Sequence, residues 1–264
     1  MADLASGKTS QEIREEIRSG INVAPTAGIA PGIVQTNLAI LPQSEAFDFL
    51  LFCQRNPKPC PLIEVIEAGE VEAKISAPKS DIRKDLPLYR IYEYGSMINE
   101  VEDISEYWKD DFVSFLLGCS FSFESALINN GIPLRHYEEC KNVSMFITNL
   151  ETEPAGAFSG PMVVSMRAIP RDNIVRAVQV TSRFPSVHGA PIHIGDPHAI
   201  GIHDINKPDF GDVTTLEGDE VPVFWACGVT PQSIAMNSKP PIMITHAPGH
   251  MFLTDIKDEE LSLI

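Results

Sequence analysis

The sequence predicts a mixed α/β fold, with a mixed sheet covered by helices. Segments with the period of a helix alternate along the chain with short segments that have the period of a strand. Residues 221–226 are apolar on both faces of an extended chain, which is typical of a strand whose sheet is covered on both sides. The last third of the chain continues with short apolar runs separated by Gly, Pro, His and Asp.

The first helix is predicted from residue 10 to about Gly20. Thr9 and Glu12 have the spacing of a capping box, in which the threonine hydroxyl bonds forward and the glutamate reaches back. The following segment, 22–42, contains several Pro and Gly residues and is predicted as a long ordered loop or a pair of turns.

A second helix is predicted over residues 44–55. Its apolar residues Phe47, Leu50 and Leu51 are expected to be buried. The segment 56–59 contains two prolines, which end the helix.

The middle of the chain is predicted to alternate strands and helices. Roughly alternating apolar and polar residues predict strands at 62–67, 71–76 and 86–94. A helix is expected around Trp108, Phe112, Phe115 and Leu116, with a break at 118–120 and a continuation to Asn130. Strands at 143–149 and 161–169 and a helix at 172–183 follow.

Composition and charge narrow the class of protein. The 264 residues carry a formal net charge of −16, and such an acidic chain repels phosphate, which argues against a nucleic-acid partner. No uninterrupted apolar segment is long enough to span a membrane, and the first ten residues lack the apolar core of a signal peptide. The five cysteines fit neither a disulfide framework nor a zinc site. We therefore expect a cytoplasmic protein with reduced thiols and no membrane partner.

Histidines are concentrated in the last third of the chain. Six of the seven lie between residues 188 and 250: His188, His193, His198, His203, His246 and His250. Histidine exchanges protons near neutral pH, so His188, His193, His246 and His250 are candidate catalytic residues, with Asp196 close enough in sequence to orient one of them. A structural hydrogen-bonding role is the alternative for each. No HExxH or comparable signature is present, and no metal ligand is predicted.

Two strand-to-helix turns are candidates for binding a carboxylate. In 227–232 an apolar strand ends, Gly228 permits a tight turn, and Thr230 can cap a helix whose first turn contains Gln232. Free amides and the helix dipole favour an anion at such a turn, at the strand end where open α/β sheets bind ligands. In 118–124, Ser120 or Ser122 can cap a second helix. A plain structural connection is the alternative for both turns.

Other side chains near these turns are candidates for chemistry. Cys119 precedes a helix, where thiol pKa values are lowered, and Glu124 lies in the first turn as a capping partner or an acid/base group. Arg90 and Arg183 are candidates to hold a carboxylate through two parallel hydrogen bonds. An inert buried thiol, a structural cap and ordinary ion pairs are the respective alternatives.

The sequence resembles the D-glutamate cyclase family over nearly its whole length. The segments that carry the resemblance are QTN (35–37), FLLFCQRNPKPCP (49–61), DIRKDLP (81–87), DFVSFLLGCSFSFE (111–124), RH (135–136), GPMVVSMR (160–167), RFPSVHGAPIHIGDP (183–197), PVFWACGVTPQ (222–232) and THAPGHMF (245–252). Long contiguous segments of this kind are far more specific than a single short motif.

The resemblance implies a fold and an activity. The fold is a layered α/β body, expected at 1–120 and 186–264, with a smaller two-layer α/β subdomain inserted at 121–185. The activity is that of a hydro-lyase that converts D-glutamate to 5-oxo-D-proline and water, without a cofactor. His188 or His193 would supply base and acid, with Asp196 tuning the imidazole, and Asn37 joins the substrate-binding residues.

Three other functions remain open from the sequence. One is a different dehydratase acting on a hydroxy acid. The second is a metal-dependent hydrolase that uses the His and Asp residues, and the third is a non-catalytic protein that binds a small acid. All of them share a small carboxylate as the ligand, and the sequence leaves open whether the protein is a homo-oligomer.

Overall fold

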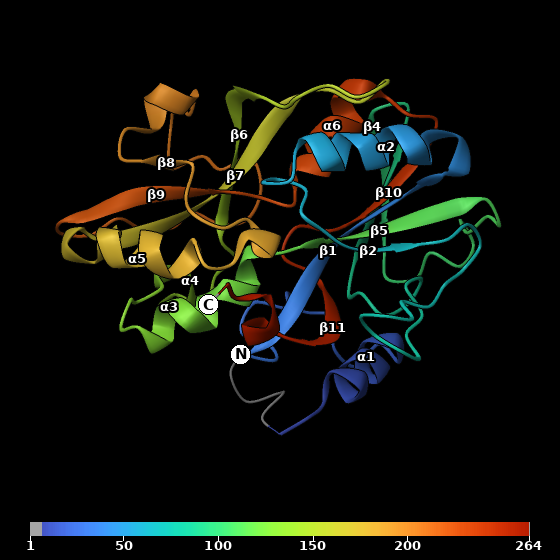
Figure 1. Cartoon of the computed structure of the whole chain (residues 1–264), viewed down its shortest axis with the longest axis horizontal. Coiled ribbons are helices and arrows are strands. Elements are labelled where there is room, and N and C mark those ends of the chain that lie inside the picture. Colours follow the sequence, from blue (N-terminus) through green and yellow to red (C-terminus); the bar gives the residue numbers. More distant parts are fainter. Residues whose placement is uncertain (1–6, 264) are drawn as a thin grey trace.

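Two antiparallel sheets and the helices around them form the fold (Figure 1). The structure is a computed structural model that describes residues 7–263. The predicted α/β class is confirmed. The expectation of a mixed sheet is not met, because every described strand pair is antiparallel. Apolar residues on both faces of a strand therefore indicate here that both faces of the sheet are covered. They do not indicate parallel pairing, with which this pattern is often associated.

The larger sheet has seven strands in the order β2-β5-β1-β10-β3-β4, with β11 also paired to β1. Their bounds are β1 (Ile33–Pro42), β2 (Leu62–Ile66), β3 (Tyr89–Glu93), β4 (Ser96–Val101), β5 (Phe112–Gly118), β10 (Met243–His246) and β11 (Phe252–Lys257). One edge of β1 pairs with β5 along most of the strand. The other edge pairs with β10 at Ala39 and Ile40 and with β11 at Gln35 and Thr36. The sheet therefore divides beside Leu38, where one partner strand ends and the other begins.

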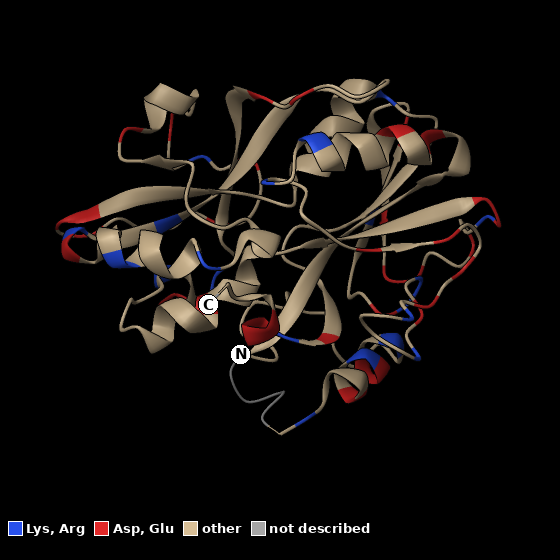
Figure 2. Ribbon diagram, in the orientation of Figure 1, with Lys and Arg blue, Asp and Glu red and all other residues tan. Residues whose placement is uncertain are grey.

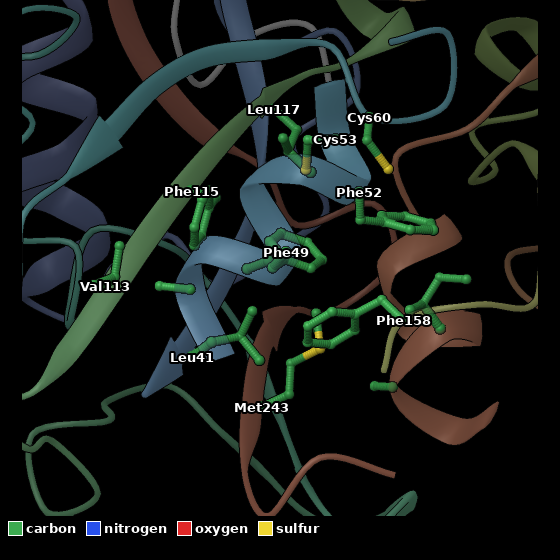
Figure 3. Close-up of a cluster of buried hydrophobic side chains, with 14 of the residues drawn as sticks. Leu41, Phe49, Phe52, Cys53, Cys60, Val113, Phe115, Leu117, Phe158 and Met243 are labelled. Carbon is green, nitrogen blue, oxygen red and sulfur yellow. The ribbon is translucent and has the colours of Figure 1, made fainter. Parts of the chain in front are cut away.

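Helices α2 (Gln43–Arg55) and α6 (Thr230–Ser238) cover one face of this sheet. Figure 3 shows the core beneath them, in which Phe49 and Phe52 of α2 lie beside Phe115 of β5 and Phe158. The Phe49 ring meets those of Phe115 and Phe158 edge-on, with centroids 4.9 and 5.3 Å apart. Met243 of β10 completes this part of the core.

The opposite face of the larger sheet is covered mainly by irregular chain. The segment between β2 and β3 contributes a row of buried apolar residues: Ala73, Ala77, Ile82 and Leu86. Helix α1 (Ser10–Arg18) packs against β11 through Ile13, Ile17 and Leu253.

The second sheet has four strands in the order β6-β7-β9-β8, and its helices lie together below β9 in the view of Figure 1. The strands are β6 (Ser144–Glu151), β7 (Pro161–Pro170), β8 (His193–Ile194) and β9 (Glu220–Ala226). The helices are α3 (Glu124–Asn129), α4 (Arg135–Glu138) and α5 (Ile174–Thr181), with short 3-10 helices η1 (Ser120–Phe123), η2 (Arg171–Asn173), η3 (Pro185–Val187), η4 (Pro197–Ile200) and η5 (Asp258–Leu261). The division into 1–120 plus 186–264 and an inserted 121–185 stays a prediction; the second sheet takes β8 and β9 from beyond that insertion.

Several elements are confirmed. Helix α1 begins at Ser10 with Thr9 as its N-cap, and Thr9 and Glu12 form the predicted capping box. Helix α2 occupies the predicted segment, but its apolar face is wrong in the prediction. Phe47 is 73% exposed and Leu50 is 38% exposed. The buried residues of α2 are instead Ala46, Phe49, Phe52 and Cys53.

Three segments differ from the sequence prediction. Residues 112–118 form the fully buried strand β5 and not a helix. The segment predicted as a loop over 22–42 contains the central strand β1, and residues 71–76 form no strand. Strands β4 and β11 had no counterpart in the prediction.

Figure 2 shows charged residues mainly in loops, at the outer ends of strands and on α1. A few charged residues are buried, among them the ion pair of Glu124 and Arg167 at the candidate site. Among residues 7–263, no helix is long and apolar enough to cross a membrane.

Candidate active site

The ends of β5 and β9 come together beside β1. Cys119 follows β5 and Cys227 follows β9, and both pack in one buried cluster with Phe121, Val229 and Met251. Segments far apart in the sequence thus meet where the two sheets adjoin. We call this region the junction and define it as residues 35–38, 118–124, 188, 227–232 and 246–251.

Asn37 lies in the junction with its side chain in a fixed orientation. Its Nδ2 donates hydrogen bonds to the carbonyl oxygens of Leu117 (3.2 Å) and Gly118 (2.8 Å). Gly228 lies directly against this carboxamide, since a Cβ at 228 would come within 1.8 Å of Nδ2. Glycine is therefore the residue that lets the start of α6 approach β1 so closely.

Two serines hold the turn after β5. The Ser122 hydroxyl accepts a hydrogen bond from the Gln35 main-chain N–H at 3.1 Å. The Ser120 hydroxyl accepts one from Nη2 of Arg167 at 3.0 Å. Ser120 or Ser122 was predicted to cap a helix whose free amides bind a carboxylate. In the structure both hydroxyls instead fix the turn, against β1 and β7.

Most amides of the two predicted anion-binding turns are already bonded within the turns. Phe121 N–H donates to the sulfur of Cys119 at 3.5 Å, and Ser122 N–H donates to the Cys119 carbonyl at 3.1 Å. At the start of α6, Thr230 N–H donates to the Cys227 carbonyl at 3.0 Å. The Thr230 hydroxyl also donates to that carbonyl, at 2.7 Å. These turns therefore offer fewer free donors to a carboxylate than their sequences suggest.

Glu124 and Arg167 form a buried ion pair beneath the junction. Both side chains are almost completely buried, and Nε and Nη2 of Arg167 donate to Oε1 of Glu124. The guanidinium also lies over the rings of Phe123 and Trp225, at 5.2 and 5.4 Å from their centroids. Burial alone would raise the pKa of Glu124, but His136 and Arg167 outweigh it and hold that pKa below its ordinary value.

His136 was not singled out from the sequence, although it belongs to the family-like RH pair. Its Nε2 lies 3.0 Å from Oε1 of Glu124, and its side chain is 1% exposed. The ring packs edge-on against Tyr137. The signal for it in the sequence was its place in that pair, because a helix of only four residues, α4, has no periodicity that would mark it.

His188 is a buried histidine with one ring nitrogen engaged. Its Nδ1 lies 2.8 Å from the carbonyl oxygen of Lys58, which can only accept, so Nδ1 carries the hydrogen. Nε2 then presents a lone pair, and it has no hydrogen-bond partner among residues 7–263. Burial lowers the pKa of His188 to about 4, so the ring is neutral near pH 7.

A second group of side chains surrounds the first turn of α6. Gln232 is fully buried, and its Oε1 accepts hydrogen bonds from the Tyr92 hydroxyl (3.1 Å) and from Arg90 (3.3 Å). Arg90 also donates to Glu100 at 2.8 Å, and 23% of its side chain is exposed. Gln232 thus fixes an arginine whose other face reaches solvent.

His246 occupies the point where the sheet divides. The Leu38 N–H donates to its Nδ1 at 3.2 Å, while the Leu38 carbonyl lies farther away at 3.4 Å. The hydrogen of the neutral ring is therefore on Nε2, which has no partner among residues 7–263. Burial lowers the pKa of His246 to about 3 and also lowers the pKa of the partly buried His250. His188 and His246 are thus neutral imidazoles of opposite tautomer.

Comparison with known proteins identifies the family. Residues 113–255 match the sequence profile of D-glutamate cyclase. A protein of Thermoanaerobacter sp. (strain X514) named "Putative hydro-lyase" is 64% identical over 95% of this chain and 95% of its own. The protein of Bacillus subtilis (strain 168) named "Putative hydro-lyase YcsI" is 61% identical over 96% and 99%. The chain belongs to the D-glutamate cyclase family.

Among solved structures, a nitrogen repressor-like protein from Methanococcus jannaschii matches with a TM-score of 0.40 and 11% identity. The match covers 89% of this chain and 91% of that one. Both of the relatives above have names of the hydro-lyase class.

Four of the predicted site residues of this cyclase-family chain lie outside the junction. Arg90 still contacts it through Gln232, whereas the other three do not. His193 is on the edge strand β8, and its Nε2 lies 2.7 Å from the main-chain carbonyl of Asp196. The Asp196 carboxylate accepts instead from the His198 N–H and caps η4, so it does not contact the imidazole that it was expected to tune. Arg183 lies beyond α5, where it donates to the Leu263 carbonyl at 3.1 Å. Their catalytic and binding roles stay predictions without a geometric link to the junction.

The cysteine thiols of the junction are buried, and the described side chains form no group of possible metal ligands. Burial raises the pKa of the Cys119 thiol far above its ordinary value and that of Cys227 to about 11. Both thiols are thus protonated near neutral pH, which disfavours Cys119 as a nucleophile. Within the described part of the chain, no three His, Cys, Asp or Glu side chains are grouped so as to hold a metal ion.

Proposed function

We propose that the protein is a hydro-lyase that cyclises D-glutamate to 5-oxo-D-proline with release of water. The observation that carries the proposal is the arrangement along the start of α6. At one end Gly228 lies against Asn37, which also contacts Gly118 beside His188. Four residues on, Gln232 holds Arg90. Gln232 lies in the first turn of α6, only four residues beyond Gly228, and this short separation suits a small substrate with a carboxylate at one end and an amine at the other.

The reaction needs no external proton. The α-nitrogen forms a bond to the side-chain carboxyl carbon, and one carboxyl oxygen leaves. The α-ammonium has three hydrogens and the lactam nitrogen keeps one, so the other two leave with the oxygen as water. A base must first accept a proton from the ammonium, because only the neutral amine has a lone pair with which to attack.

His188 is the base in this proposal. It is neutral near pH 7, its Nδ1 is fixed on the Lys58 carbonyl, and Nε2 has a free lone pair. A base whose ring orientation is fixed by its second nitrogen is the arrangement used in other proton-transfer sites.

Arg90 and His246 act on the carboxyl groups of the substrate in this proposal. Arg90, held by Gln232 and Glu100, binds a carboxylate of the substrate. His246 presents Nε2–H, which can donate a hydrogen bond to the oxygen that develops negative charge as the carbon becomes tetrahedral. A neutral imidazole is suited to hydrogen-bond donation, and its lowered pKa is consistent with that role.

The test is a direct assay of purified protein. D-Glutamate, L-glutamate and a panel of hydroxy acids are offered separately, and 5-oxoproline and unsaturated acids are measured by mass spectrometry. We expect 5-oxoproline from D-glutamate. We also expect His188→Ala to lower the turnover by about 10²- to 10⁴-fold, the usual effect of removing a general base. His203→Ala, at an exposed histidine, is the matched control and should retain full activity.

The outcome also separates the alternatives. Unsaturated acids formed from a hydroxy acid would support the other dehydratase and refute the cyclase activity. Full activity of His188→Ala would refute the role of this histidine while leaving the reaction itself in place.

A further inference from the structure

We propose that the carboxamide oxygens of Gln35 and Asn37 bind the amino group of the substrate and select amino acids over the corresponding hydroxy acids. The inference rests on the proposed function, from which it takes that the substrate carries carboxylates. It goes beyond that function because it assigns the amine to two named oxygen atoms, one of them on a residue with no role so far.

The orientation of the Gln35 amide is fixed by its neighbours. Nε2 donates to the Thr26 carbonyl at 3.0 Å, and a carbonyl can only accept, so the nitrogen faces Thr26 and Oε1 faces away from it. The main-chain N–H is held by Ser122. Gln35 is 4% exposed, and its Oε1 is buried without a hydrogen-bond partner among residues 7–263. A buried acceptor in that position costs free energy until a donor arrives.

The same reasoning fixes Asn37. Its Nδ2 faces two main-chain carbonyls, those of Leu117 and Gly118, and only the nitrogen of the amide can donate to them. Oδ1 therefore points away from these two carbonyls, and Gly228 lies against the whole carboxamide, since a Cβ there would come within 2.4 Å of Oδ1 and 1.8 Å of Nδ2. The hydrogen bonds of this side chain to described residues all use Nδ2.

The two oxygens lie on one face of β1. Gln35 and Asn37 are alternate residues of a strand, so their side chains leave the sheet on the same side, with Cα atoms about 7 Å apart. Amide side chains at that spacing can converge on one atom between them.

The chemistry of this pair distinguishes an amine from other groups. Both atoms are hydrogen-bond acceptors, so a carboxylate, which has only acceptors, would be repelled. A hydroxyl has one hydrogen and satisfies one of the two oxygens. An amine or ammonium has two or three and satisfies both. Held through its hydrogens, the amine also keeps a defined direction for the nitrogen lone pair that attacks the carboxyl carbon.

The experiment measures binding separately from turnover. Four five-carbon dicarboxylates that differ only at C2 are used: D-glutamate, L-glutamate, 2-hydroxyglutarate and glutarate. Dissociation constants are measured by calorimetry and by ligand-dependent thermal shift for the wild type and for Gln35→Met, which keeps the length of the side chain and removes its acceptor. Gln179→Met, at an exposed glutamine of α5, is the matched control. Gln35→Glu, with a similar shape, is the second variant if Gln35→Met folds poorly.

We expect the wild type to bind at least one glutamate enantiomer about tenfold or more tightly than 2-hydroxyglutarate and glutarate. Gln35→Met should remove most of this preference and leave the weak binding of glutarate unchanged, and Gln179→Met should retain the preference. In Gln35→Glu, the added negative charge should preserve binding of the ammonium form.

Equal binding of glutamate and glutarate by the wild type would overturn the inference, as would an amine preference that survives in Gln35→Met or a failure of both glutamates to bind. Failure of the proposed function gives a different pattern. In that case an amine-bearing ligand binds with the expected dependence on Gln35, but no 5-oxoproline forms.

Discussion

Neutralising Glu124 tests how the junction is held together. Glu124→Gln keeps the shape of the side chain but leaves the Arg167 guanidinium buried without a counter-charge, since 0% of the Glu124 side chain and 1% of the Arg167 side chain are exposed. Removing one partner of a buried ion pair costs about 3–5 kcal/mol. The rings of Phe123 and Trp225 lie over the guanidinium and retain part of its stabilisation, which is worth up to about 2 kcal/mol when desolvated. We therefore expect a loss of about 1–3 kcal/mol in the free energy of unfolding.

The assay is urea unfolding followed by tryptophan fluorescence. Trp225 is a suitable reporter because it is fully buried and its indole N–H donates to Thr181 at 3.1 Å. Glu70→Gln is the matched control, because the Lys74–Glu70 pair is exposed and such pairs contribute about 0–1 kcal/mol. The double variant Glu124→Gln with Arg167→Met should recover part of the loss, since it removes the uncompensated charge as well.

The pH dependence gives an independent check. The pKa of Glu124 is lowered in the folded protein, so its contribution to stability is present above its ordinary value of 4.5 and is lost as the pH falls through the lowered pKa. The difference between the wild type and Glu124→Gln should therefore shrink only below about pH 4.5. A loss under 1 kcal/mol at pH 7, or a difference that is constant down to low pH, would refute the description of Glu124 as an ionised structural partner.

Three further outcomes are expected. Phe49→Ala should lower the free energy of unfolding by about 3–5 kcal/mol, because it leaves a cavity beside Phe115. Phe47→Ala, at a side chain that is 73% exposed, should change it by less than about 0.5 kcal/mol. Urea unfolding measures both. If His188 is the base, kcat/KM for D-glutamate should fall only as the pH drops toward about 4, and an acid limb centred well above pH 5 would assign the base to another group. Because burial lowers the pKa values of His188 and His246, the unfolded chain binds protons more readily below about pH 6.5, and each histidine should add a slope of about 1.4 kcal/mol per pH unit to the loss of stability on acidification. In His246→Gln this slope should decrease between pH 6.5 and 5, and an unchanged slope would contradict the burial of a neutral imidazole.

The sequence could predict elements whose ends have their own local chemistry. Helix α1 is an example, because Thr9 and Glu12 satisfy the first amides of the helix through contacts only three residues apart. Helix α6 is another, since Gly228 permits a tight turn and Pro231 favours the first turn of a helix in any fold. No knowledge of the rest of the chain is needed for either.

Strand β5 shows why other elements could not be predicted. Phe112, Phe115 and Leu116 have helical spacing, but β5 lies between β2 and β1 with both of its faces covered, so all of its residues are buried. When both faces are apolar, the two-residue period of a strand disappears, and a coincidental helical period remains. Likewise, Phe47 fits the apolar stripe predicted for α2, but the side of the helix that faces the sheet depends on tertiary packing.

The candidate site was predictable in its segments and not in its geometry. The segments of the family resemblance include both turns that meet at the junction, where Gly228 lies against Asn37 and Gln232 bonds to Arg90. Sequence proximity failed for Asp196, which is three residues from His193 but turns its carboxylate to the start of η4. The contacts of Glu124 with Arg167 join residues 43 positions apart, and pairs of that kind have no local signature.

The polar residues of β1 connect the misread strand with the site. Residues 35–37 interrupt an otherwise apolar strand, whose segment was predicted as a loop because of the Pro and Gly residues before it. Buried polar side chains at the centre of a sheet are costly unless they are fully bonded, so a chain shaped by stability alone would place apolar residues there. Asn37 engages its nitrogen, but Gln35 leaves an oxygen buried without a described partner. The dependence of amine binding on Gln35 is therefore the measurement that decides whether a ligand completes the hydrogen bonding of this oxygen.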